Sequence, residues 1–299
     1  MTAALAMLLL GSSTSGPSRP DWMWGVTVDN LDEPALIAES LRRLPSRPTI
    51  RLVFDESAGP EYYVEAAKHI KAVGTVVGEP IDSALTKKVS VQQYRDRMRW
   101  YMDVLKDQVD IWEIGNEING DWGGPSTEVA SKIQGAFDEA RKRKLPTVLT
   151  LFYSDHYLGT EREMVTWSKK YLSSGVRSGV DYVLVSFYPH SATGTHPNWS
   201  TAFRRISQAF PRARVGFGEL GLANADYTLN KDSLANEALM RRYYALPKNF
   251  AKRFVGGYFW WSYRQDAVPT ERPLWRVLSE VIASVDQGRP ARVNGTRRQ

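Results

Sequence analysis

The sequence predicts an α/β fold, a (β/α)8 TIM barrel in a single domain, on three observations. Short apolar segments rich in β-branched and aromatic residues alternate with longer amphipathic segments, eight of each along the chain. The apolar segments are continuously hydrophobic, as in residues 182–187, which is typical of strands covered on both faces. The length of 299 residues suits one such barrel, which commonly takes about 250 residues.

Each expected strand is a run of five to seven residues between segments of helical period. In chain order the expected strands are 24–28, 49–54, 75–79, 110–116, 147–152, 181–187, 215–219 and 256–262.

Each expected helix has one apolar face. In residues 91–108, for example, Tyr94, Met98 and Tyr101 recur at steps of three and four, with charged residues between them. The alternative fold is a doubly wound open sheet, but no G-x-G-x-x-G follows an early strand and no P-loop motif occurs. The expected helices are 33–44, 61–73, 91–108, 126–144, 161–176, 201–210, 234–253 and 274–285.

Composition excludes several classes of protein. The 42% hydrophobic and 11% aromatic content is too high for a disordered chain, and no apolar run approaches the roughly 20 residues of a membrane-spanning helix. Without cysteine there is no disulfide, no thiolate metal site and no cysteine nucleophile. The net charge of +6 falls to about +2 without the four arginines of the last eleven residues, so we expect no nucleic-acid partner.

The two ends of the chain differ from the barrel in composition. Residues 1–20 contain an apolar run followed by a Ser/Gly/Pro stretch, which indicates a truncated, signal-like or disordered leader and a secreted or periplasmic protein. We expect the catalytic barrel over 21–286 and a flexible basic tail over 287–299. We also expect a monomer.

Acidic residues lie at or just past most of the expected strands. Because reactive groups in this fold lie at the carboxyl ends of the strands, these residues form the first shortlist. Glu117 follows the fourth strand and Glu219 ends the seventh, so their carboxyl groups are expected to face one another across the barrel mouth. The full shortlist is Asp29, Asp55, Glu79, Glu117, Asp155, Glu219 and Asp266.

Two facing carboxyl groups are what glycoside hydrolysis requires. In a retaining enzyme the groups are about 5 to 5.5 Å apart, and one attacks the anomeric carbon while the other protonates the departing oxygen. A general acid of this kind needs a raised pKa, which a dry pocket and a neighbouring carboxylate provide.

The motifs at these strand ends resemble clan A of the retaining (β/α)8 glycoside hydrolases over 22–285. The resemblance rests on Asn116-Glu117 at the fourth strand, Glu219 at the seventh and the segment FWWSY at the eighth. It implies that Glu117 is the acid/base, that Glu219 is the nucleophile and that Asn116 binds the sugar 2-hydroxyl. Families 39, 51 and 53 of the clan are resembled about equally.

Further substrate-binding or supporting roles are expected for side chains near this pair. Arg51 resembles the clan's arginine beside the nucleophile; the alternative is an ion pair with Glu113, whose strand parity places it inside the barrel. Tyr188 resembles the clan's tyrosine that bonds the nucleophile, and the alternative is a rim aromatic. Trp261 is expected to stack on a sugar while its neighbour Trp260 packs on the helices.

Rim loops supply more candidates for sugar contacts. His190 and His156 could bind sugar hydroxyls, and their spacing gives no metal-binding pattern, so we expect no metal and no cofactor. As a group, six aromatic residues of the predicted loops favour further sugar subsites, while for any single one of them packing is the expected role: Trp122, Trp199, Tyr153, Tyr157, Tyr227 and Tyr263.

The sequence therefore predicts a retaining β-glycoside hydrolase acting on a β-linked polysaccharide or oligosaccharide. The loops after the strands are mostly short, which favours an open cleft and endo action. The alternative is a non-catalytic carbohydrate-binding TIM barrel that retains the glutamate pair.

Overall fold

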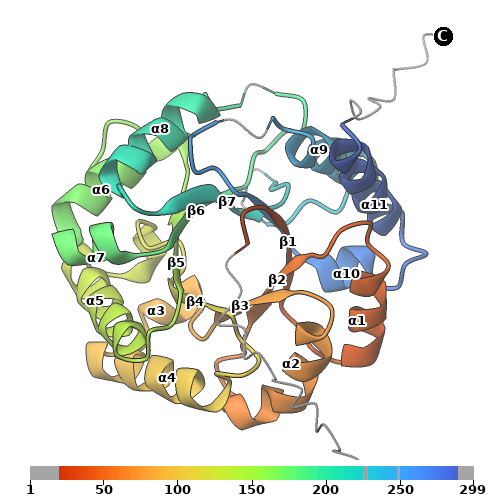
Figure 1. Ribbon diagram of the computed structural model, residues 1–299. Coiled ribbons are helices and arrows are strands. Elements are labelled where there is room, and N and C mark those ends of the chain that lie inside the picture. The colour runs from red at the N-terminus through yellow and green to blue at the C-terminus, as the bar shows by residue number, and fades with distance from the viewer. Residues whose placement is uncertain (1–19, 195, 225, 227, 248–249, 289–299) are drawn as a thin grey trace, which may run out of the picture.

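The computed structural model describes residues 20–194, 196–224, 226, 228–247 and 250–288. They form a closed barrel of eight parallel strands in chain order, β1 to β8, inside a ring of helices (Figure 1). β8 pairs with β1, so the described sheet has no free edge. The predicted fold class, a single-domain (β/α)8 TIM barrel, is confirmed.

The strands are buried on both faces, as their continuous hydrophobicity predicts. All eight coincide with the predicted segments to within two residues at each end. Their bounds are β1 (Met23–Val28), β2 (Thr49–Val53), β3 (Thr75–Glu79), β4 (Ile111–Gly115), β5 (Thr147–Phe152), β6 (Tyr182–Phe187), β7 (Arg214–Leu220) and β8 (Gly256–Trp260).

The long helices cover the outside of the barrel (Figure 1). Every predicted helical segment contains one, and short helices follow several strands in addition. The bounds are α1 (Pro34–Arg42), α2 (Val64–Lys71), α3 (Ser83–Thr86), α4 (Val91–Val104), α5 (Ser126–Lys142), α6 (Met164–Tyr171), α7 (Ser174–Gly179), α8 (Trp199–Ala209), α9 (Ser233–Tyr244), α10 (Tyr263–Ala267) and α11 (Pro273–Asp286), with 3-10 turns η1 (Pro60–Tyr63), η2 (Asp121–Gly123) and η3 (Asp155–Tyr157).

Three predicted helices were too long, the first of them 91–108, which ends at Val104. The segment 161–176 divides into α6 and α7, because Leu172 is extended and the Ser173 hydroxyl accepts a hydrogen bond from the Val176 N–H to begin a new helix. In the segment 234–253 the helix α9 ends at Tyr244. Amphipathic character continues past these helix ends, which is why periodicity alone did not find them.

The apolar core has two parts. The larger part lies between the sheet and the helices. The smaller part fills the inside of the barrel with residues drawn mostly from the starts of the strands: Met23, Val77, Ile111, Val148, Tyr182, Leu184, Val255 and Phe259. The polar side chains that line the pocket described below lie at the other end of the barrel, where the strands finish.

The predictions for the chain ends lie almost entirely outside the described residues. The leader over 1–20 is described only at residue 20, and the basic tail over 287–299 only at residues 287 and 288. No helix in the described part of the chain combines the length and the apolar composition needed to span a membrane.

Candidate active site

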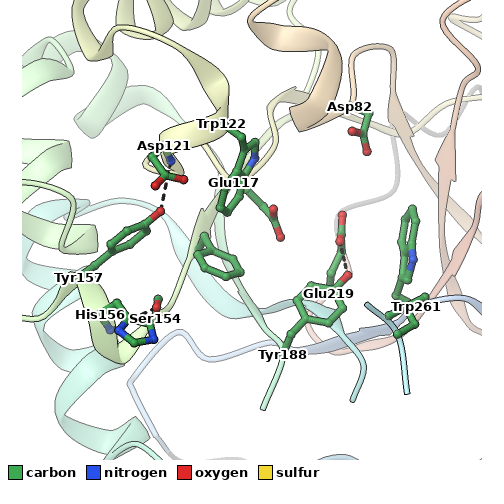
Figure 2. A pocket seen from close by; sticks show the side chains of 12 residues that line it. Asp82, Glu117, Asp121, Trp122, Ser154, His156, Tyr157, Tyr188, Glu219 and Trp261 are labelled. Carbon is green, nitrogen blue, oxygen red and sulfur yellow. Dashed lines mark hydrogen bonds between the residues drawn. The ribbon is translucent and has the colours of Figure 1, made fainter. Parts of the chain in front are cut away.

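Glu117 and Glu219 lie at the carboxyl end of the barrel and line one pocket of about 710 Å³. β7 carries Glu219 within its last residues, whereas Glu117 is two residues beyond the end of β4. Figure 2 shows the two carboxyl groups facing one another, with Trp122 on one side and Trp261 on the other. The pocket is lined by Asp82, Glu117, Asp121, Trp122, Phe152, Ser154, His156, Tyr157, Tyr188, Glu219, Leu229 and Trp261.

The two glutamates are held very differently. Glu219 receives a hydrogen bond from Asn116 Nδ2 at 3.0 Å and another from the Tyr188 hydroxyl, and Arg51 Nη1 lies 2.7 Å from its Oε1. Glu117 is 8% exposed, and its Oε1 is buried with no hydrogen-bond partner in the described part of the chain. The surroundings therefore stabilise a carboxylate at Glu219 and leave Glu117 without comparable support.

The electrostatics of the pair follow from these contacts. Burial raises the pKa of Glu117 well above its ordinary value, and the negative charges of Glu219 and Asp82 raise it further. Burial also raises the pKa of Glu219, but there the charge of Arg51 is the next largest influence and, with the Tyr188 hydroxyl, lowers it. At Glu117 the lowering effects of Arg51 and Ser186 are smaller than the raising effects of burial and of the two negative charges. Glu117 is consequently the group that keeps a proton, and Glu219 is the one that can be ionised beside it.

Arg51 lies beneath the pocket and joins three carboxyl groups. Its guanidinium nitrogens are 2.6 Å from Glu113, 2.8 Å from Glu79 and 2.7 Å from Glu219. Both interpretations of this arginine therefore hold, since it pairs with Glu113 and also with Glu219. Arg51 is 1% exposed and, like Asn116, is not among the residues that line the pocket, so direct contact of either side chain with a substrate stays a prediction.

The predicted sugar-contacting side chains divide into two groups. Tyr188, Trp261 and Trp122 line the pocket, whereas Trp260 is buried and donates from Nε1 to Asp266 at 2.9 Å. His190 is exposed and is not among the residues that line the pocket, so its expected sugar contact is not supported by its position.

The weaker candidates from the rim loops are also divided. His156 and Tyr157 line the pocket. Trp199 and Tyr263 are buried in the core and are corrected to packing residues. Half-buried Tyr153 packs on Trp199, and Tyr227 lies outside the described residues.

Sequence reasoning missed five lining residues: Asp82, Asp121, Phe152, Ser154 and Leu229. Asp82 carried a signal, because an aspartate placed two residues before Ala84 can cap a helix that follows the third strand, and its Oδ1 does accept from the Ala84 N–H at 2.7 Å. The acidic shortlist took only Glu79 from this strand end, and Glu79 is fully buried below the pocket.

Over the described ranges, no set of three or more histidine, aspartate and glutamate residues is arranged to hold a metal ion.

The chain was compared with known proteins by sequence and by structure. No protein-family model and no curated protein matches the sequence. Among solved structures it is similar to an endo-β-1,4-glucanase from Xanthomonas axonopodis pv. citri, with a TM-score of 0.54 and 14% identity over 86% of this chain and 97% of the other.

Two further solved structures have the same fold. One is a thermostable mutant of a xylanase from Cellvibrio japonicus, with a TM-score of 0.54 and 16% identity over 88% of this chain and 98% of the other. The other is an endo-β-1,3-glucanase from Amycolatopsis mediterranei in complex with laminaritriose, with a TM-score of 0.52 and 12% identity over 87% of this chain and 98% of the other. At these identities the likeness establishes the barrel fold.

Proposed function

We propose that this chain is a retaining β-glycoside hydrolase of clan A that cleaves β-linked polysaccharides or oligosaccharides. The observation that carries the proposal is the asymmetry of the facing pair: Glu219 is supported as a carboxylate by Arg51, Asn116 and Tyr188, while Glu117 is buried with a raised pKa. The three similar structures are named as two endo-β-glucanases and a xylanase. These enzymes hydrolyse glycosides, which agrees with the proposed chemistry.

In the first step an oxygen of Glu219 attacks the anomeric carbon as the glycosidic bond breaks. Glu117 transfers its proton to the departing oxygen, and the sugar is left as an ester on Glu219. In the second step the Glu117 carboxylate takes a proton from water, the water oxygen attacks the anomeric carbon, and the ester bond breaks. Loss of the Glu219 charge in the ester lowers the pKa of Glu117, which suits its change from acid to base.

Asn116 connects the nucleophile to the substrate in this mechanism. Its Nδ2 donates to Glu219, and its Oδ1 is buried with no hydrogen-bond partner among the described residues. A sugar 2-hydroxyl that donates to Oδ1 would satisfy this atom, and hydrogen bonds of this kind strengthen in the oxocarbenium-like transition state.

Endo action is the finer part of the proposal. Trp122 and Tyr157 lie at one side of the carboxyl pair and Trp261 at the other, so aromatic faces are available for sugars on both sides of the cleaved bond (Figure 2). An endo enzyme releases products of intermediate size early in the reaction, which chromatography of the products against time would detect. Export and a monomeric state fit action on a polymer and belong to the same proposal.

The test begins with a panel of β-glucans, mannans, xylans, galactans, chitosans and polyuronates. On the substrate that responds, Glu219→Gln is expected to lose activity by about a thousandfold or more, because it removes the nucleophile. Glu65→Gln, an exposed glutamate on α2, serves as the matched control and should retain full activity.

An activated 2-fluoro glycoside of the same sugar should label the protein covalently. Mass spectrometry is expected to find the adduct on the peptide that contains Glu219, and an adduct on another carboxylate would contradict the assignment. If oligosaccharides bind in the pocket but neither cleavage nor labelling occurs, the alternative of a non-catalytic carbohydrate-binding barrel replaces the proposal.

A further inference from the structure

We propose that Asp82 is a specificity residue that binds an ammonium group on the substrate, so that the pocket prefers β-linked amino sugars over neutral sugars and rejects uronic acids. This inference rests on the proposed function and names its substrate class. It concerns a side chain that the mechanism of bond cleavage does not use.

The charge of the pocket is the first observation. The described residues that line it include four carboxyl groups, those of Asp82, Glu117, Asp121 and Glu219, and no lysine or arginine. The chain as a whole carries +6, so the pocket is an acidic site on a basic protein. A field of this sign attracts cationic ligands and repels anionic ones.

The single arginine beneath the pocket does not reverse this sign. Arg51 is shared among Glu79, Glu113 and Glu219, so one positive charge faces three carboxyl groups. A substrate carboxylate placed above them would meet no unshared cation among the described residues of the site. Burial without such a partner is costly, which is the physical basis for rejecting uronic acids.

Asp82 is placed to meet the substrate itself. It comes from the loop between β3 and α3, is half-buried, and points toward the gap between Glu117 and Glu219 in Figure 2. It lines the same pocket as both glutamates, and its charge raises the pKa of each.

One carboxylate oxygen of Asp82 accepts a backbone hydrogen bond, which leaves the other oxygen to accept from a ligand. Oδ1 accepts from the Ala84 N–H at 2.7 Å, which fixes the side chain. Over the described residues, no lysine or arginine forms an ion pair with Asp82. Glu117 also lines this pocket, and its buried Oε1, which has no hydrogen-bond partner among the described residues, gives a second acceptor. A sugar ammonium group has three donors and can satisfy both.

The experiment measures binding by calorimetry with three series of oligomers matched in linkage and length. They are oligomers of glucosamine, glucose and glucuronic acid, each in β-1,3- and β-1,4-linked forms, at a pH where the amine is protonated. The Glu117→Gln variant is used as the parent, because glutamine resembles the protonated acid and prevents turnover. Asp82→Asn is added to it, and Asp121→Asn is the control that removes the same charge elsewhere in the pocket.

The glucosamine series should bind most tightly, and the glucuronate series should not bind measurably. Asp82→Asn should weaken glucosamine binding by about tenfold or more, as expected for a charge-assisted contact, and should change glucose binding by less than about twofold. Asp121→Asn should have the smaller effect on glucosamine.

Three results would overturn the inference while leaving glycoside hydrolysis intact. They are equal binding of glucose and glucosamine, an equal effect of Asp82→Asn on both, and cleavage of a polyuronate by the wild-type protein. Binding of none of the oligomers, together with no cleavage in the polysaccharide panel, would instead overturn the proposed function and the inference with it.

Discussion

The backbone of Glu117 has a left-handed conformation, with φ at 46°. This region is unfavourable for a residue with a side chain and costs of the order of 1 to 3 kcal/mol where the surroundings impose it. The flanking residues Asn116 and Ile118 are buried and anchor the turn. The strained residue is therefore the one that faces Glu219. In this backbone conformation the Glu117 side chain lines the pocket.

The hydrogen bond from Tyr188 to Glu219 leads to a prediction on pH dependence. The bond stabilises the ionised carboxyl group and so lowers the pKa of Glu219. Tyr188→Phe should raise that pKa, and because the nucleophile acts as a carboxylate, the acidic limb of kcat/KM should move to higher pH by about one unit. Tyr157→Phe, which changes a lining tyrosine that does not contact Glu219, should leave the limb in place.

A second prediction concerns Glu117 as the acid/base. Glu117→Gln should slow hydrolysis of a glycoside with a poor leaving group by about a hundredfold or more, since departure then lacks a proton. A glycoside with a good leaving group should be affected less in its first step, and added azide should restore turnover and yield a β-glycosyl azide. Equal losses on both glycosides with no azide product would contradict this role.

At the scale of elements, β8 approaches its neighbours too closely for a side chain at Gly257. This residue has φ of 98°, and a Cβ there would lie 1.9 Å from the carbonyl oxygen of Phe217 on β7. This close contact joins β7 to β8 just before Trp260 and Trp261 in the chain. Trp260 is buried in the core, and Trp261 lines the pocket.

Gly257→Ala should therefore lower the free energy of unfolding by about 2 to 5 kcal/mol, from the backbone conformation and the clash together. Gly159→Ala is the matched control, because Gly159 also has positive φ, at 76°, but a Cβ there would meet no atom within 4 Å. The control should lose only about 1 to 2 kcal/mol. Chemical denaturation measures both, and equal losses would show that the close approach between β7 and β8 has no energetic role.

At the scale of the whole molecule, the buried acids predict how stability depends on pH. Burial raises the pKa of Glu79, Glu117 and Glu219 above the ordinary value of 4.5. A raised pKa means that the folded protein holds these protons more tightly than the unfolded chain. The stability they contribute is complete below pH 4.5 and is lost as the pH rises through the folded-state pKa values.

Thermal unfolding should therefore show Tm falling from mildly acidic toward neutral and alkaline pH. At the other end, Glu139 has a pKa lowered to about 2, where burial is outweighed by hydrogen bonds from Arg95, Lys142 and Arg143, so its contribution is lost as the pH falls below 4.5. Glu79→Gln should reduce the fall of Tm on the alkaline side. An unchanged slope in this variant would contradict the assignment of a proton to Glu79.

Much of the fold and part of the site could be predicted from the sequence. All eight strands were predictable because strands with two covered faces leave continuous apolar runs, and Glu117 and Glu219 followed from their strand ends. Asp82 and Asp121 lie in loops whose path depends on packing, so their contribution to the pocket could not be read from spacing. For the same reason the sequence could not say which of the loop aromatics pack in the core, as Trp199 and Tyr263 do, because an aromatic ring at the rim and one in the core look alike in sequence.

The sequence by itself determined the barrel, the order of its strands and the two glutamates at its mouth, because hydrophobic period and strand ends are local properties. Only the tertiary structure decided how the two glutamates differ in their tendency to be ionised. Arg51 within β2, Asn116 after β4 and Tyr188 after β6 converge on Glu219, while Glu117 receives no equivalent support from the described residues. A pKa depends on burial and on neighbours that are distant in the chain, and these exist only once the barrel has closed.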